Sequence, residues 1–200
     1  MSKFHAPTVN IPEGNWLLSQ RMLKDAFNGT VLWDFSGEQV PELMGLSADQ
    51  VAGKIHYFAI NEQFHAVISN VTVNDWIYDD WNLDGWVGFN FTLNGEQATI
   101  LDGQKQIDLA GPRMVVSAKS KDASMTKCFK PNQELMQLNV IVKPELLEQE
   151  FGYSEEDMPE YLREACAGEE HRVYVGERPL SVDMSRATEQ LFNKQLDGKP

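Results

Sequence analysis

The sequence has few of the residues that metal and nucleophile chemistry require. Its only cysteines, Cys128 and Cys166, lie far apart and without CxxC spacing, which is typical of two structural thiols in a reducing compartment. Four histidines are present, and no two of them have HxH spacing. A nucleophile motif of the GxSxG type is also missing. We therefore expect no catalytic residue, no metal and no cofactor.

Positive charge and long apolar runs are also scarce. The 17 basic residues are outnumbered by 30 acidic ones, which gives a net charge of −13 and argues against direct nucleic-acid binding by this chain, since phosphate contacts need clustered cations. No run approaches the roughly 20 apolar residues that span a bilayer. The start, MSKFHAPTVN, has no apolar core of a secretion signal. The expected location is the cytoplasm.

Short alternating strands dominate the middle of the chain. The segment from Trp76 to Ala118 is punctuated by Asp-Gly, Asn-Gly and Gly-Pro pairs, and within it apolar residues such as Phe89 and Phe91 alternate with polar ones. The pair Asn94-Gly95 between two such runs predicts a hairpin. Strands this short and this closely spaced favour a sandwich or small barrel with an interior. The predicted class is α+β, mainly β.

The pattern changes along the chain in a way that predicts three parts. Residues 1–53 are expected to form a helix over 15–27 and an irregular segment that packs on the barrel, with a helical piece near Ser47 to Ala52. Residues 54–143 form the β-barrel, which is expected to bind a ligand. Residues 144–200 form a helical subdomain with helices after Pro144, up to Gly168 and from an N-cap at Ser181 to Leu196.

A dense cluster of aromatic residues is the leading candidate for ligand contact. Large planar rings with a polar edge suit stacking on an aromatic ligand and orienting it; the alternative is that the rings are ordinary core. The cluster is Trp76, Tyr78, Trp81, Trp86, Phe89 and Phe91.

Basic residues gather in one stretch, 113–130, in an otherwise acidic chain. The stretch holds Arg113, Lys119, Lys121, Lys127 and Lys130. An anionic ligand needs such compensating charge, and the planar fork of Arg113 suits a pair of ligand oxygens. Lysines that protect a strand edge from aggregation are the alternative explanation.

The last helix carries an apolar stripe. Met184, Ala187, Leu191 and Phe192 recur at helical spacing. The stripe is expected either to dock on the β-domain or to form a dimer interface.

The order of these elements resembles a known family. FNFTLNGEQATILDGQKQIDLAGPRMVVSA, then LNVIVKPELLEQEFG, then SRATEQLFNKQLDG is similar to the amino-terminal effector domain of AraC-type transcription regulators, above all the siderophore-responsive subgroup. The resemblance covers about Phe64 to Leu196. It implies a double-stranded β-helix of the cupin kind, helices that often dimerise, and a DNA-binding domain of two helix-turn-helix units beyond Pro200.

Three functions follow as hypotheses. The first is a regulatory domain that binds a small organic effector, such as a siderophore, and reports it to that DNA-binding domain. The second is a small cupin-like enzyme, an isomerase or a carbohydrate-modifying protein. The third is an interaction module whose acidic helices, with ten carboxylates among residues 145–170, bind a basic partner.

Overall fold

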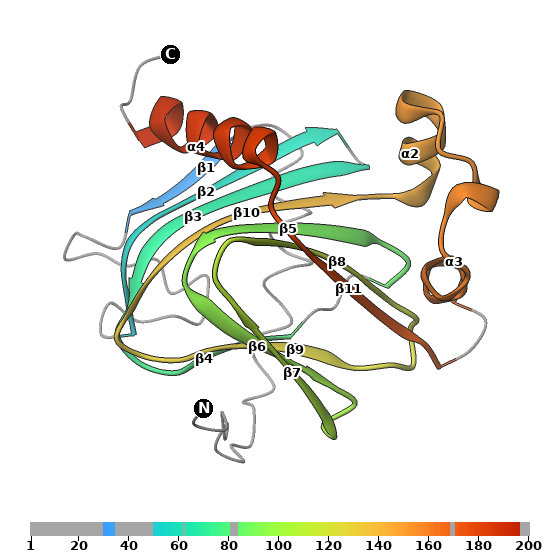
Figure 1. Cartoon of the computed structure of the whole chain (residues 1–200), viewed down its shortest axis with the longest axis horizontal. Coiled ribbons are helices and arrows are strands. Elements are labelled where there is room, and N and C mark those ends of the chain that lie inside the picture. Colours follow the sequence, from blue (N-terminus) through green and yellow to red (C-terminus); the bar gives the residue numbers. More distant parts are fainter. Residues whose placement is uncertain (1–29, 35–49, 62, 81–83, 169–170, 197–200) are drawn as a thin grey trace.

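The computed structural model describes residues 30–34, 50–61, 63–80, 84–168 and 171–196 (Figure 1). The predicted helix over 15–27 lies outside these residues. Within them, no helix is both long and apolar enough to cross a membrane.

The described residues form two antiparallel sheets. The larger has the strand order β1-β2-β3-β10-β5-β8-β11 and the smaller has the order β4-β9-β6-β7. The strands of the larger sheet are β1 (Thr30–Asp34), β2 (Val51–Asn61), β3 (Phe64–Val73), β5 (Val87–Asn94), β8 (Arg113–Lys119), β10 (Gln133–Val142) and β11 (Val173–Pro179). Those of the smaller sheet are β4 (Ile77–Asp80), β6 (Glu96–Leu101), β7 (Lys105–Ala110) and β9 (Met125–Phe129).

The order of the eight strands from β3 to β10 defines the fold. The chain alternates between the two sheets at every step except from β6 to β7, and the first strand pairs with the last. This arrangement, with four strands in each of two facing sheets, is the double-stranded β-helix, or jelly roll. The predicted fold class is confirmed.

The chain passes from one sheet to the other at Asn94-Gly95, where a hairpin was predicted. That prediction is wrong, because β5 pairs with β10 and β8 whereas β6 pairs with β9 and β7. Gly95 has φ +108°, and a Cβ there would lie 2.8 Å from the Leu135 side chain. The glycine is therefore needed for a sharp change of sheet. The short-range hairpin signal gives the turn but not the partner strand.

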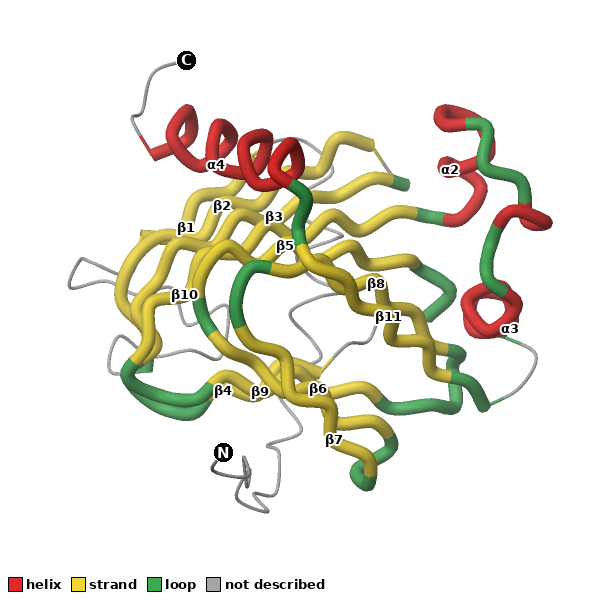
Figure 2. Tube along the Cα trace, in the orientation of Figure 1, coloured by secondary structure: helices red, strands yellow, loops and turns green. Residues whose placement is uncertain are grey.

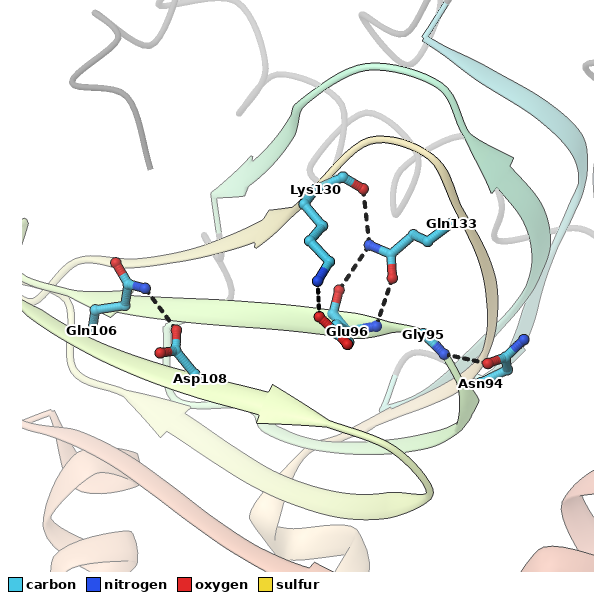
Figure 3. Close-up of polar contacts among 7 residues, drawn as sticks. All are labelled: Asn94, Gly95, Glu96, Gln106, Asp108, Lys130 and Gln133. Atoms are coloured by element: carbon cyan, nitrogen blue, oxygen red, sulfur yellow. Dashed lines mark hydrogen bonds and ion pairs between the residues drawn. The ribbon is translucent and has the colours of Figure 1, made fainter. Parts of the chain in front are cut away.

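Gln133 ties this crossing point to the neighbouring one between β9 and β10 (Figure 3). The Glu96 backbone N–H donates to Gln133 Oε1 at 2.6 Å, and Gln133 Nε2 donates to the carbonyl oxygens of Glu96 and Lys130, each at 2.9 Å. Lys130 also forms an ion pair with Glu96. One side-chain amide thus satisfies the backbone groups that the sheet change leaves without a ladder partner.

Two differences concern the ends of the predicted barrel. The expected helical piece near Ser47 to Ala52 overlaps the start of β2, where Val51 pairs with Val73 and is fully buried. Strand β11 was not expected among the helices, and it extends the large sheet by pairing with β8. In both places strand pairing to an existing sheet overrides the local pattern.

Three helices follow the barrel strands, as predicted, and Figure 2 shows them outside the barrel. They are α2 (Pro144–Phe151), α3 (Glu160–Ala167) and α4 (Val182–Leu196), with a 3-10 turn, η2 (Glu155–Asp157), between the first two. The predicted cap is present, because the Met184 backbone N–H donates to Ser181 Oγ at 3.2 Å. Gly152 and Gly168 end α2 and α3 in left-handed conformation.

The helices cover the outer face of the large sheet. Leu146 of α2 and Leu162 and Ala165 of α3 pack with Val87, Ala118 and Val142. Phe192 of α4 is 1% exposed and packs with Ile68 and Leu138. The large sheet therefore has an apolar outer face, and its inner face is left to line the space between the sheets.

Candidate functional site

The inner faces of the two sheets carry a layer of polar side chains, which we call the polar belt. Those with a relative exposure of at most 6% come from both sheets, and Asn139 is half-buried. The belt consists of Asn90 and Thr92 on β5, Gln97 and Thr99 on β6, Lys127 on β9, and Gln137 and Asn139 on β10.

Strand register places these residues at the same level. Asn139 is opposite Asn90 in the β10–β5 pair, and Thr99 is opposite Lys127 in the β6–β9 pair. Two contacts then join the sheets: Gln137 Nε2 donates to Gln97 Oε1 at 2.8 Å, and Lys127 Nζ donates to Asn139 Oδ1 at 3.5 Å. Because these bonds connect different sheets, the belt lies between them.

Within the large sheet the belt is linked by further hydrogen bonds. Asn90 Nδ2 donates to Asn139 Oδ1 at 2.5 Å, Thr92 Oγ1 donates to Asn90 Oδ1 at 2.8 Å, and Gln137 Nε2 donates to Thr92 Oγ1 at 3.1 Å. Such a network fixes the side-chain orientations. It is also a set of amide and hydroxyl groups of the kind that orients a small ligand.

Lys127 brings charge into the belt. Burial lowers the pKa of its ammonium group, and the carboxylate of Asp79 acts in the opposite direction. Asp79 is opposite Lys127 in the β4–β9 pair, so its side chain lies on the same face of the small sheet. Burial raises the pKa of the Asp79 carboxyl group, whereas the nearby Lys127 acts to lower it. The inner face of the small sheet therefore carries an acidic and a basic side chain next to one another.

An apolar layer lies beside the belt at one end of the barrel. Met125 and Ile141 are its buried members, and Trp86, Leu101, Val173 and Val175 pack against them. The Trp86 ring lies 5.1 Å from the His65 ring, and Lys143 Nζ is 4.6 Å from the Trp86 ring centroid. Burial lowers the pKa of His65.

The predicted aromatic cluster does not converge in one place. Trp86 lies in the apolar layer just described, but the rings of Phe89 and Phe91 point to the outer face of the large sheet. Because side chains alternate along a strand, Asn90 and Thr92 take the inner positions of β5. The expectation that these two phenylalanines line the interior is corrected: they are core under the helices.

Trp76 and Tyr78 are placed differently again. Their rings stack on one another with centroids 6.2 Å apart. Tyr78 is opposite Cys128 in the β4–β9 pair, on the face of the small sheet away from Lys127. Trp81 lies outside the described residues. The structure thus brings Trp86 to the interior and leaves Trp76 and Tyr78 apart from it.

The basic stretch does not form a continuous rim. Arg113 forms an ion pair with Glu177 and also donates to the Ala110 carbonyl oxygen. Lys119 is buried and forms an ion pair with Asp84, two residues before Trp86. On β8, Arg113 lies six residues from Lys119, or about 20 Å in an extended strand. Trp86 and Arg113 are therefore at opposite ends of the barrel.

Cys128 is not an activated thiol. It is fully buried, and burial together with Asp80 raises its pKa to about 11. The side chain of Lys127 points to the opposite face of β9 and cannot lower that pKa.

Sequence reasoning missed the polar belt. Its signal is a polar residue at every second position of a strand whose other positions are apolar, as in FNFT and MQLNV. This pattern is typical of a strand with a solvent-exposed face. Here the helices cover the apolar face, and the second sheet covers the polar one. Among the described residues no group of three or more His, Cys, Asp or Glu side chains is placed to hold a metal ion.

Comparison with known proteins gives the family. The fold and the polar interior define a domain of the double-stranded β-helix class. The sequence model of the family described as "Regulatory protein PchR N-terminal domain" matches residues 52–199. The chain belongs to this family and is the amino-terminal domain of an AraC-type regulator, as the resemblance predicted.

Solved structures similar to the chain include several cupin domains. The cupin domain of an XRE-family transcriptional regulator from Enterobacter cloacae is 13% identical, with 48% of this chain and 98% of that chain covered and a TM-score of 0.37. A cupin superfamily protein from Desulfitobacterium hafniense is 14% identical, with 56% of this chain and 98% of that chain covered and a TM-score of 0.36. KdgF from Halomonas sp. is 10% identical, with 47% of this chain and 80% of that chain covered and a TM-score of 0.35. No curated protein is similar enough in sequence to be a relative.

Proposed function

We propose that this domain senses a small organic effector between its two sheets and reports occupancy to a DNA-binding domain of the same regulator. Family membership supports the regulatory role. The polar belt is the observation that carries the binding role, because a barrel that is simply packed is stabilised better by apolar side chains than by buried amides. The regulator acts in the cytoplasm, and this domain has no catalytic role.

The strands offer a direct route from effector to helices. Asn90 and Thr92 face the interior, while Phe91 between them packs against the cluster that holds Phe192 of α4. An effector that binds the belt and shifts β5 or β10 therefore moves the surface on which α4 rests. Such a ligand changes the population of two arrangements only if it binds one of them more tightly.

Trp86 is the aromatic residue proposed to contact the effector, which we take to be aromatic or siderophore-like. The test is a thermal-shift and tryptophan-fluorescence screen of aromatic acids and ferric siderophores on the whole chain. A binder should raise the melting temperature and change the fluorescence, and Trp86→Phe should remove most of that change while Trp76→Phe retains it. A screen in which no compound stabilises the chain would contradict the proposal.

A dimer through α4 is the second part of the proposal. Phe192, predicted in the interface, is instead buried against the sheet, whereas Met184, Ala187 and Leu191 form an exposed stripe. The helix thus docks through one face and leaves another available. Sedimentation should show a dimer that Leu191→Glu converts to monomer, while Gln190→Glu, with the same charge change next to the stripe, does not. A wild-type monomer at high concentration would contradict this part.

A further inference from the structure

A buried histidine lies on the outer face of the large sheet, next to the cluster that holds α4. His56 of β2 is opposite Ile68 of β3, and residues opposite one another on two strands share a face. Ile68 packs with Leu138 and with Phe192 of α4. The His56 ring stacks on the ring of Phe58, with centroids 6.2 Å apart, and Phe58 packs against the same cluster. His56 therefore belongs to the apolar layer between the sheet and α4.

The path of α4 leads toward the strand that carries His56. The helix follows β11, at one edge of the large sheet, contacts β5, and packs on β10 and β3 through Phe192. The next strand in the sheet order is β2, and Figure 1 shows α4 along the side of the sheet where β1, β2 and β3 lie. One helical turn advances about 5.4 Å, close to the spacing of about 4.8 Å between strands. Because α4 ends at Leu196, one turn beyond Phe192, its last turn comes next to β2.

The imidazole of His56 is poorly placed to carry a charge while α4 is docked. The residue is 7% exposed, and its Nε2 atom is buried without a hydrogen-bond partner among the described residues. An ionised group buried without a partner costs far more free energy than a neutral one. Burial accordingly lowers the pKa of His56, and the positive charge of Lys54 lowers it further.

The other described groups around His56 do not offset this penalty. On β3 the residues opposite Phe58, His56 and Lys54 are uncharged: Ala66, Ile68 and Asn70. On β1 the residue opposite His56 is Leu32, and the acidic residue of that strand, Asp34, is opposite Lys54. Three charged residues of α4 are exposed: Asp183, Arg186 and Glu189. A charged His56 is therefore stabilised only when water reaches it, which requires the last turn of α4 to move away.

We propose that His56 makes the docking of α4 sensitive to pH, so that protonation of His56 in mildly acidic solution releases the last turn of α4 from the sheet. The released state, in which the imidazole has its ordinary pKa of about 6.5, binds one proton more than the docked state. Docking is thus strongest above that pH and weakens as the pH falls toward the lowered pKa. The inference goes beyond the proposed function, because it needs no effector.

The experiment is amide hydrogen exchange of the whole chain without effector, at about pH 7.5 and about pH 5.5, with each rate corrected for the intrinsic rate at that pH. Protection of the last turns of α4 should fall about tenfold, because the uptake of one proton by a group of pKa about 6.5 shifts the equilibrium by about that factor. His56→Phe, which keeps an aromatic ring and removes the titrating group, should abolish this fall. His65→Phe is the matched control at a buried histidine on the inner face, opposite Ile141, and should retain it.

Three results would overturn the inference. The first is an α4 protection that does not change with pH, and the second is an equal fall in wild type and His56→Phe. The third is a fall that both histidine variants reduce equally, because α4 then exchanges only by global unfolding. If His56→Phe does not fold, as judged by circular dichroism, His56→Gln replaces it with the same expectation. If neither variant folds, the wild-type chain decides alone: α4 should be less protected than β10 at both pH values, and equal protection of the two elements overturns the inference.

Discussion

The side-chain amide of Gln137 on β10 donates to that of Gln97 on β6 at 2.8 Å, and this bond joins the two sheets through the barrel interior. Gln137 also donates to Thr92, which in turn donates to Asn90. The two sheets are therefore held at a defined separation by hydrogen bonds as well as by apolar packing. A displacement of one sheet should therefore also move the hydrogen-bonded side chains of the other.

Gln97→Leu should destabilise the fold. It removes the acceptor of a buried amide N–H, and leaving such a group unsatisfied costs about 1–3 kcal/mol. The double variant with Gln137→Leu should lose less than the sum of the two single variants, because contacting residues are not additive. Urea denaturation measures both. The control is Gln106→Leu, because the hydrogen bond from the Gln106 side-chain amide to Asp108 is exposed. An equal loss of unfolding free energy in this control would contradict the assignment of the belt to the interior.

The two faces of α4 should respond differently to truncation. Phe192 is buried against Ile68 and Leu138, so Phe192→Ala should lower the free energy of unfolding by about 3–5 kcal/mol. Leu191, next to it, is 42% exposed, so Leu191→Ala should change the free energy by no more than about 0.5 kcal/mol. The free energies of unfolding of both variants are measured at a protein concentration below that at which any dimer forms. Similar losses in the two variants would mean that α4 docks differently.

Local pattern predicted the strands and the helix ends well, because alternation and capping depend on neighbouring residues. Ser181 as N-cap and the short alternating strands between Trp76 and Ala118 illustrate this. The hairpin at Asn94-Gly95 shows the limit. Turn residues report backbone conformation, whereas pairing depends on strands far away in sequence, here β10 and β9.

The candidate site could be predicted only in part, for a related reason. The alternation of side chains along a strand predicts that Phe89 and Asn90 point to opposite faces, but it does not predict which face is the interior. The usual assignment puts the apolar face inside, and it fails here because α4 and α2 provide the large sheet with a second apolar core. The sequence named Trp86 as one of six aromatic residues, and only the structure places it in the apolar layer of the interior, while Lys127 looked like one lysine of a surface stretch.

Cys128 should resist thiol reagents in the folded protein. With its pKa raised to about 11 by burial, roughly one thiol in a thousand is ionised near pH 8. A Cys166→Ser variant, which retains only Cys128, should therefore react with an aromatic disulfide reagent slowly when native and rapidly in guanidinium chloride. The reverse variant, Cys128→Ser, reports on Cys166 alone. Rapid labelling of native Cys128 would show that the small sheet opens.

Stability should fall as the pH is lowered from about 7.5 to 5.5. Burial lowers the pKa of both His65 and His56 below the usual value of about 6.5, with Lys54 adding to the effect at His56. Below that value the unfolded chain takes up protons that the folded chain does not, so the free energy of unfolding decreases until the pH reaches the lowered pKa. Urea denaturation of His65→Phe should show a shallower decrease, since the aromatic contact with Trp86 is kept and the titrating group is lost. His171→Gln, at an exposed ion pair with Asp102, should not flatten the curve. If His65→Phe follows the wild-type pH dependence, His65 is protonated within the folded barrel, and its environment is more polar than the burial of its ring implies.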